Sequence, residues 1–385
     1  MQRRRFLSLG AFALPASVLS TSLVPAAAQA ASTDSPSPGP ADGWRTFELT
    51  TRVDLPATRG PANVWLPVAI SPSGTYQHAL GTRWEAPGAN AALRMVHGAS
   101  GIGVPMLAVA WPEGAAQDTR TVTLVNTFTT RDRSVDLSQP PSANAPRESP
   151  EVLRQYLQPT ALQPTDGLVR ETAEKITRGE TGDVAKARAI YQWIVENCRR
   201  EGTVRGCGTG DVRYMLTTGN LAGKCADINA LFTALARSVG IPARDAYGVR
   251  VATSRRGFNS LGKAGDVTRA QHCRAEFYAA GYGWVPVDPA DVRKVMLEEV
   301  AGGLPIDDLR VRAARAMLFG QWEMNWVAFN HGADIALPEA PGALAAREST
   351  VPFLMYPNGE VAHARLDSLD PDTFRYRMNA REINA

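Results

Sequence analysis

Three residue types that together can form a nucleophilic site occur in order in the second half of the chain. Cys225 follows a Gly-Lys turn and begins a stretch in which apolar residues recur every three or four positions, the spacing of one helix face. A thiol at a helix N-terminus lies at the positive end of the backbone dipole, which favours the nucleophilic thiolate. His272 and Asp288 lie at the start and end of two strand-like segments joined by a Gly-Tyr-Gly turn. A cysteine, a histidine base and an orienting acid are the parts of a Cys-His-Asp triad.

The segments that must position these residues are predicted to be one helix and two strands. Gly240 and Pro242 follow the helical stretch and are typical of a helix end. Alternation along the first strand places His272 and Arg274 on one face and Cys273 on the opposite, core-facing side. Cys273 is therefore predicted to pack in the core and to point away from His272. The apolar positions of the helix are Ile228, Leu231, Phe232, Leu235, Ala236 and Val239.

These blocks resemble the transglutaminase-like superfamily. The resemblance rests on Gly-x-Cys-x-Asp before the helix, Gly-Ile-Pro-Ala-Arg after it, a histidine, and then Gly-Trp-x-x-x-Asp-Pro. It covers about the central third of the chain and implies a papain-like core, with Cys225 as nucleophile, His272 as base and Asp288 as orienting acid. One position departs from the pattern, since Arg274 stands where many relatives have an aromatic residue, and this bears on substrate fit. The other matched positions are Gly223, Gly240, Pro242, Arg244, Trp284 and Pro289.

Each residue of the predicted triad also has a structural interpretation when it is considered alone. A free cysteine is most often a small buried hydrophobe, and a lone strand histidine is often a satisfied structural residue. An aspartate before a proline, as at Asp288, is an ordinary turn residue. The three blocks in this order and at this spacing favour the catalytic interpretation of Cys225, His272 and Asp288.

Residues 1–30 have the pattern of a twin-arginine signal peptide. Residues 3–5 are arginines followed by two apolar residues, and a mildly apolar segment extends to Val24. The small residues at Ala28–Ala30 are typical of a cleavage site, and the serine, proline and glycine content favours a cleaved signal over a membrane anchor. The sequence therefore predicts a periplasmic or secreted protein with no stable membrane span after signal removal.

The charge balance argues against nucleic acid as a partner. The chain has 41 basic and 38 acidic residues, and removal of the signal takes away three arginines and leaves 38 of each. No basic excess then remains to bind a phosphate backbone. With 44% hydrophobic and 21% charged residues, the composition is that of a globular protein, and the length of 385 residues suggests two domains.

The four cysteines have different expected roles. Cys198 and Cys207 flank a short polar loop and could form a disulfide in an oxidising compartment, whereas Cys225 must stay unpaired to act as the nucleophile. The sequence contains no Cys-x-x-Cys and no His-x-x-x-His pair, so no metal site and no cofactor are expected.

The chain divides into segments of different composition. Residues 31–43 form a polar, proline-rich linker, and residues 44–133 contain short β-rich runs typical of an antiparallel β-sandwich. A second linker, residues 134–149, precedes a transglutaminase-like catalytic core at residues 150–295. This core begins with segments that are predicted to be helical. Residues 296–385 are predicted as a C-terminal extension packed on the core. The predicted fold class is α+β.

A polar loop rich in glycine and arginine, residues 254–270, precedes His272. A long polar loop beside a predicted site is either a lid or substrate-reading element or a solvated connection, and its length does not separate the two.

The sequence thus predicts an exported thiol hydrolase that cleaves peptide or amide bonds through a thioester, with a peptide or protein as its partner and cell-wall peptides as a plausible substrate. Two alternatives remain open. Transglutaminase-type amine transfer uses the same chemistry up to the thioester, and a catalytically idle binding or scaffold protein would have no chemical need for all three triad residues.

Overall fold

The structure is a computed structural model that describes residues 43–56, 60–72, 76–113, 120–338 and 349–383. The predicted signal peptide and nearly all of the first predicted linker lie outside these described residues. No helix within them combines the length and the apolar character that a membrane crossing needs.

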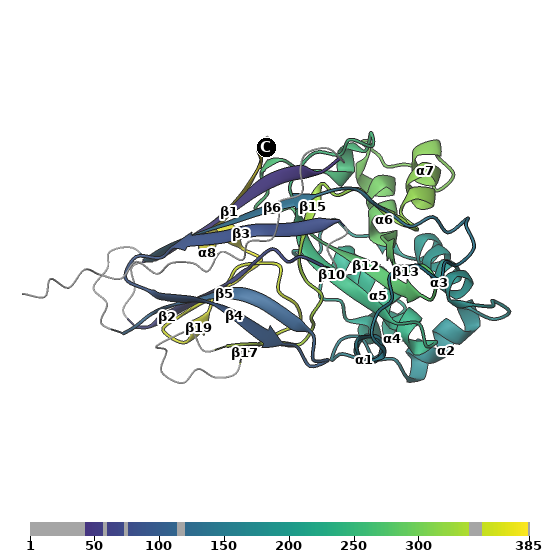
Figure 1. Ribbon diagram of the computed structural model, residues 1–385, viewed down its shortest axis with the longest axis horizontal. Coiled ribbons are helices and arrows are strands. Elements are labelled where there is room, and N and C mark those ends of the chain that lie inside the picture. The colour runs from purple at the N-terminus through teal and green to yellow at the C-terminus, as the bar shows by residue number, and fades with distance from the viewer. Residues whose placement is uncertain (1–42, 57–59, 73–75, 114–119, 339–348, 384–385) are drawn as a thin grey trace, which may run out of the picture. The chain divides into compact units, whose positions relative to one another are not determined.

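Two five-stranded antiparallel sheets form a sandwich whose inner faces share one buried cluster (Figure 1). The first sheet has the order β11-β20-β1-β6-β3, and its strands are β1 (Arg45–Leu55), β3 (Gln77–Glu85), β6 (Arg120–Thr130), β11 (Gly265–Asp266) and β20 (Tyr376–Ile383). The second has the order β19-β18-β2-β5-β4, and its strands are β2 (Ala62–Pro67), β4 (Asn90–His97), β5 (Gly103–Trp111), β18 (Asn358–Val361) and β19 (Ala364–Arg365). The predicted antiparallel sandwich is confirmed.

The sandwich core follows from the alternation of side chains along the strands. In β1 and β6, buried positions alternate with more exposed ones, because only one face of this sheet packs inward. Phe47 and Leu49 of β1 belong to the same buried cluster as Leu107 and Val109 of β5. The cluster extends to Leu231 in the following domain, so sandwich and core share one continuous apolar interior.

A four-stranded antiparallel sheet and a central helix form the core. The sheet has the order β13-β12-β10-β15, and its strands are β10 (Ala243–Arg250), β12 (Gln271–Ala279), β13 (Gly283–Val287) and β15 (Trp326–Asn330). Helix α5 (Cys225–Ser238) packs on β10 and β12 and is contacted by α2, α3, α4 and α6. All residues of α5 are buried, and its polar Asn229, Thr233 and Arg237 are satisfied by hydrogen bonds to Cys273, Asp245 and Ala243. The other helices are α1 (Pro150–Gln155), α2 (Gly167–Ile176), α3 (Asp183–Asn197), α4 (Val212–Thr218), α6 (Pro289–Glu298), α7 (Leu309–Met317) and α8 (Pro371–Phe374).

The C-terminal segment returns to the sandwich. Strand β20 pairs with β1 from Thr46↔Ile383 to Val53↔Tyr376, and β18 pairs with β2. Part of residues 296–385, which were expected to pack on the core, therefore completes both sandwich sheets. The polar loop 254–270 also contributes to the sandwich, because its strand β11 pairs with β20.

Several shorter elements complete the fold. The loop 254–270 contains one turn of 3-10 helix, Asn259–Leu261. Three two-stranded pairs are also present among the described residues: β7 (Arg133–Ser134) with β14 (Gln321–Trp322), β16 (Ile335–Leu337) with β17 (Ser349–Val351), and β8 (Arg199–Arg200) in parallel with β9 (Ala222–Gly223).

Candidate active site

Cys225 is the first residue of α5, as predicted, so its thiol lies at the positive end of that helix. The carboxylate of Asp227 fixes this helix start. It accepts hydrogen bonds from the backbone N–H of Lys224 and of Gly210, each at 2.9 Å, which ties the loop containing Gly210 to the beginning of α5. Two glycines leave room for this carboxylate, because a Cβ at Gly208 or Gly223 would overlap the Asp227 side chain. This close approach accounts for both ends of the Gly-x-Cys-x-Asp motif.

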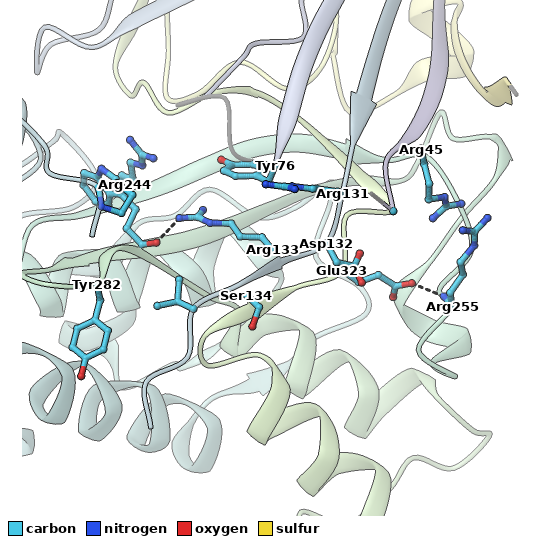
Figure 2. Close-up of a pocket in the computed structure, with 14 residues that line it drawn as sticks. Arg45, Tyr76, Arg131, Asp132, Arg133, Ser134, Arg244, Arg255, Tyr282 and Glu323 are labelled. Carbon is cyan, nitrogen blue, oxygen red and sulfur yellow. Dashed lines mark hydrogen bonds between the residues drawn. The ribbon is translucent and has the colours of Figure 1, made fainter. Parts of the chain in front are cut away.

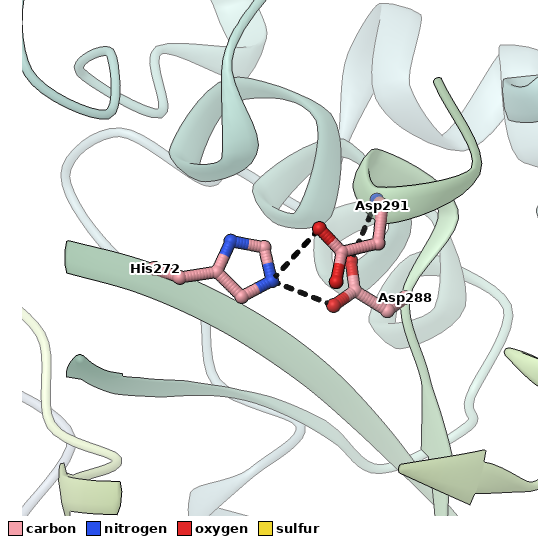
Figure 3. A group of neighbouring side chains, drawn as sticks. All are labelled: His272, Asp288 and Asp291. Carbon is pink, nitrogen blue, oxygen red and sulfur yellow. Dashed lines mark hydrogen bonds and ion pairs between the residues drawn. The ribbon is translucent and has the colours of Figure 1, made fainter. Parts of the chain in front are cut away.

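His272 lies on β12 and forms a buried group with two carboxylates (Figure 3). Its Nε2 is 2.7 Å from Oδ2 of Asp288 and 3.4 Å from Oδ1 of Asp291. Asp288 is the N-cap of α6 and Asp291 lies in the first turn, so a single helix start supplies both carboxylates. Because Nε2 faces the acids, Nδ1 is the ring nitrogen left to face a thiol.

Neighbouring side chains hold the two carboxylates in place. Oδ1 of Asp288 accepts hydrogen bonds from Nδ2 of Asn229, at 3.2 Å, and from the backbone N–H of Asp291, at 3.0 Å. Arg250 donates to Oδ1 of Asp291 at 2.6 Å. The charge of Asp291 is therefore balanced mainly by Arg250, whereas that of Asp288 faces His272.

Burial and charge change the pKa of each group. Burial alone would lower the pKa of His272, but Asp291 and then Asp288 override it and raise that pKa to about 10 despite the opposing charge of Arg250. Burial and the neighbouring Asp291 raise the pKa of Asp288. Burial acts in the same direction on Asp291, yet Arg250 and His272 hold its pKa well below the usual range. The imidazole is thus kept in its protonated form near neutral pH.

The thiols of Cys207 and Cys273 and the imidazole of His272 act on the thiol of Cys225. Cys207 and then Cys273 lower the pKa of Cys225 well below its usual range, burial opposes them, and His272 acts with them. The thiol of Cys207 also lies 3.3 Å from the backbone oxygen of Gln271. The site therefore favours a thiolate–imidazolium pair.

The structure adds to what the sequence indicated about the other cysteines. Cys273 is buried in the core, as predicted, but its thiol also reaches Cys225 and so belongs to the site. Cys198 and Cys207, considered as a disulfide, are both free. Cys198 caps the C-terminus of α3, and burial raises the pKa of its thiol to about 12. Cys207 is instead held next to Cys225, because its backbone oxygen accepts from the N–H of Ala226 at 2.8 Å.

Arg274, which departs from the family pattern, lies between Asp288 and two tryptophans. Its guanidinium is stacked over Trp322 and Trp326, 5.3 Å and 4.9 Å from the ring centroids. Its Nε is 3.7 Å from Oδ2 of Asp288, the oxygen that faces His272. Arg274 therefore contacts the buried acid rather than the substrate side of the site.

Cys225 and His272 both line one cleft of about 550 Å³. A larger cavity of about 730 Å³ contains none of the three predicted triad residues. Four of its arginines form ion pairs: Arg133 and Arg244 share the buried Glu276, and Arg45 and Arg255 share Glu382. Figure 2 shows these arginines among the side chains that line the cavity. The structure thus places the predicted site in the smaller cleft.

The spacing of His272, Asp288 and Asp291 also fits a metal ion, since one ligand atom from each lies within 4.8 Å of the others. The chemistry of the group does not fit. Oδ1 of Asp291 already accepts from the Arg250 guanidinium, and Nε2 of His272 is bonded to Asp288. A cation in this group would displace both contacts, and we derive no step through a metal.

Asp291, Cys207 and Arg250 are parts of the site that the sequence analysis did not identify. The structural alternative for Asp288 is a turn residue, although aspartate followed by proline is also a typical helix N-cap with proline at the first helical position. That signal predicts α6, and with it a residue at N3, Asp291, on the same helix start. No local pattern identifies Cys207 or Arg250, because their places depend on tertiary packing.

Comparison with known proteins agrees with this geometry. The family model of the transglutaminase-like superfamily matches residues 170–289. An uncharacterised protein of Haemophilus influenzae is 36% identical over 352 residues, which cover 88% of this chain and 91% of that protein. The crystal structure of a candidate cysteine protease from Cytophaga hutchinsonii superposes with a TM-score of 0.51 at 17% identity, covering 89% of this chain and 92% of that one. The chain belongs to the transglutaminase-like superfamily.

The pKa directions predict an unusual pH dependence for alkylation of Cys225 by iodoacetamide. A thiol with a pKa of about 8.5 loses about 100-fold in rate between pH 7.5 and pH 5.5, because its thiolate is protonated. Cys225 is expected to lose less than about tenfold, since its pKa is lowered. The measurement is the rate of mass-resolved alkylation against pH. A profile like that of a free peptide thiol would contradict the ion pair.

Replacing Cys207 is expected to move this profile to higher pH. Cys207 is the largest of the influences that lower the pKa of Cys225, so Cys207→Ala removes that stabilisation of the thiolate. The same alkylation profile measures the change, and Cys198→Ala is the matched control, because Cys198 does not line the cleft. An unchanged midpoint in Cys207→Ala would show that the thiol contact does not stabilise the thiolate.

Proposed function

We propose that the protein is an exported thiol hydrolase that cleaves peptide or amide bonds through a Cys225-His272-Asp288 triad. The observation that carries the proposal is the arrangement at one cleft: a thiol at a helix start and an imidazole both line it, and Nε2 of that imidazole lies 2.7 Å from a buried carboxylate. The fold of a candidate cysteine protease supports the same chemistry.

In the first step, the Cys225 thiolate attacks the carbonyl carbon and the carbonyl π electrons move to oxygen. The tetrahedral oxyanion needs hydrogen-bond donors at the helix start. Lys224 N–H already donates to Asp227, and Ala226 N–H to Cys207. The N–H of Cys225 has no acceptor among the described residues, and this is the donor that we assign to the oxyanion.

In the second step, the C–N bond breaks and the protonated His272 gives its Nδ1 proton to the leaving amine. A thioester with Cys225 remains. Water then attacks the thioester while His272 takes one proton from it, and collapse of this second intermediate releases the acid and the thiolate. Asp288 keeps the proton on Nε2 and stabilises the imidazolium when it forms.

The test is turnover of amide peptides by the purified protein, with active-site titration by iodoacetamide on the same sample. Loss of turnover in proportion to Cys225 alkylation supports the proposal. Turnover that persists after complete alkylation, or no turnover of any peptide amide by a protein with a reactive Cys225, contradicts it, and the latter result favours the idle scaffold. Adding a primary amine separates hydrolysis from amine transfer, because a transferase forms the new amide in preference to the free acid.

The proposal includes export and a peptide or protein as the substrate, with cell-wall peptides as one source. Export is supported by the arginines at residues 3–5 and the small residues at Ala28–Ala30. We expect the mature chain to begin near Ala31 and Arg3→Lys with Arg4→Lys to retain it in the cytoplasm. N-terminal sequencing and fractionation measure both, and an intact N-terminus on exported protein would contradict the proposal.

A further inference from the structure

The walls of the candidate active-site cleft carry more cations than acids. Two carboxylates line it, Asp266 and Asp372, together with seven cationic side chains in addition to His272. These are Arg200, Lys224, Arg250, Lys263, Arg269, Lys294 and Arg377. They come from both the core and the sandwich, so the excess is a property of the assembled cleft and not of one helix or loop.

Most of these cations share a carboxylate with another cation. Arg269 and Arg377 each lie 2.7 Å from a different oxygen of Asp372. Arg200 and Lys294 share Glu298 in the same way. Arg250 is paired with Asp291, which also faces the raised-pKa imidazole of His272. Asp372 and Glu298 are each left with one positive charge in excess, whereas Arg250 and the His272 imidazolium are balanced by Asp291 and Asp288.

Two further cations have no ion pair within the described part of the chain. Lys224 immediately precedes Cys225, and Lys263 is an exposed residue of the loop 254–270. Two contacts fix this loop. Its strand β11 pairs with β20, and the carboxylate of Glu299 accepts a hydrogen bond from the backbone N–H of Asn259 at 2.8 Å. Lys263 is therefore held at the cleft by an anchored segment. This favours a substrate-reading role of the loop over that of a solvated connection.

We propose that the cleft binds an acidic acyl donor, a peptide that carries carboxylates next to the amide that Cys225 attacks. This inference rests on the proposed function. The two cations at Asp372, the two at Glu298, and the additional Lys224 and Lys263 produce a positive potential that attracts and orients an anion and disfavours a basic peptide.

The first experiment compares two reagents that alkylate the same thiolate, iodoacetate and neutral iodoacetamide. The rate with iodoacetate is divided by the rate with iodoacetamide at Cys225, and this ratio is divided by the same ratio for N-acetylcysteinamide. Because both reagents alkylate the same thiolate, the relative ratio does not depend on the thiolate fraction. We expect this relative ratio to be raised about threefold to tenfold at low salt and to fall toward one in 0.5 M NaCl. Lys263→Glu and Arg269→Glu are each expected to lower it about twofold to fourfold. The control Lys175→Glu, an exposed charge reversal on α2 outside the cleft, should leave it unchanged.

The second experiment measures protection of Cys225 from iodoacetamide by N-acetyl-Glu-Glu-Ala-amide and by N-acetyl-Lys-Lys-Ala-amide. The acidic peptide is expected to protect at a concentration at least about fivefold lower, and Lys263→Glu should reduce that difference. A ratio of one with equal or no protection overturns the inference and leaves the proposed function standing. If neither reagent alkylates Cys225 in the folded protein, the proposed function fails and this inference fails with it.

Discussion

Cys225→Ser is expected to abolish amide hydrolysis, with a loss of turnover of at least about 10⁴-fold, while the protein stays folded. Serine fits at the first position of α5 and is a good residue at a helix start, so the fold has no reason to change. Its hydroxyl has a far higher pKa than a thiol, and the contacts from Cys207, Cys273 and His272 that stabilise the thiolate do not make it an alkoxide. In enzymes with comparable triads, removal of the nucleophile costs about six orders of magnitude.

The measurement is turnover per folded molecule, with circular dichroism and thermal unfolding on the same samples. Cys198→Ala is the matched control, because it removes another buried cysteine without touching the cleft. It should retain turnover and lose some stability from the small cavity. Retained hydrolysis in Cys225→Ser would show that another group is the nucleophile.

The central helix and the candidate triad could be predicted because their signals lie in the sequence itself. The three-and-four spacing from Ile228 to Val239 predicts a helix, and all of the observed helix α5 is buried. The segments that are predicted to be helical at the start of the core correspond to α1, α2 and α3. Cys225 begins α5, and His272 lies at the start of β12, so the motif residues stand where the sequence placed them. Short-range periodicity predicts the helix because it is a property of neighbouring residues, whereas the candidate triad is recognised from the order and spacing of three separate motif blocks.

The features that were missed depend on contacts between distant parts of the chain. Strand β3 has mostly partly exposed residues, so it lacks the alternation that predicts a strand. Strand β20 alternates well, but nothing in its sequence indicates that its partner is β1, more than 300 residues away. Arg250 and Asp291 form an ion pair inside the protein, 41 residues apart, and charged residues of this kind are normally interpreted as exposed.

The raised pKa of His272 determines how the Cys225–His272 thiolate–imidazolium pair responds to alkaline pH. Its folded pKa is about 10, above the unfolded value of about 6.5. The contribution of the imidazolium to stability is therefore complete below about pH 6.5 and is lost as the pH rises through about 10. We expect turnover to fall in the same alkaline range, because the proton that goes to the leaving amine is then absent. A pH–rate profile that falls near pH 7 would contradict this assignment.

Asp288→Asn is expected to lower turnover about tenfold to a thousandfold, with a melting temperature little changed. The asparagine oxygen can keep the two hydrogen bonds of Oδ1, from Asn229 and from the N–H of Asp291, so α6 remains capped. The amide nitrogen would then face Nε2 of His272, where it offers a donor instead of a charge. This favours the wrong tautomer and leaves the imidazolium unsupported. In a serine triad the equivalent change costs about four orders of magnitude, and a thiolate needs less help from its base.

Asp291→Asn is the control that separates an orienting acid from a structural one. Asp291 lies further from Nε2, at 3.4 Å, and its stronger contact is with Arg250, at 2.6 Å. Its replacement leaves Arg250 buried without a counter-charge, which costs roughly 3–5 kcal/mol of folding free energy. We therefore expect Asp291→Asn to lower the melting temperature more and turnover less than Asp288→Asn. Turnover and thermal unfolding of the two variants, measured side by side, decide the matter. Wild-type turnover in Asp288→Asn would reduce the site to a Cys225-His272 dyad and leave Asp288 as the cap of α6.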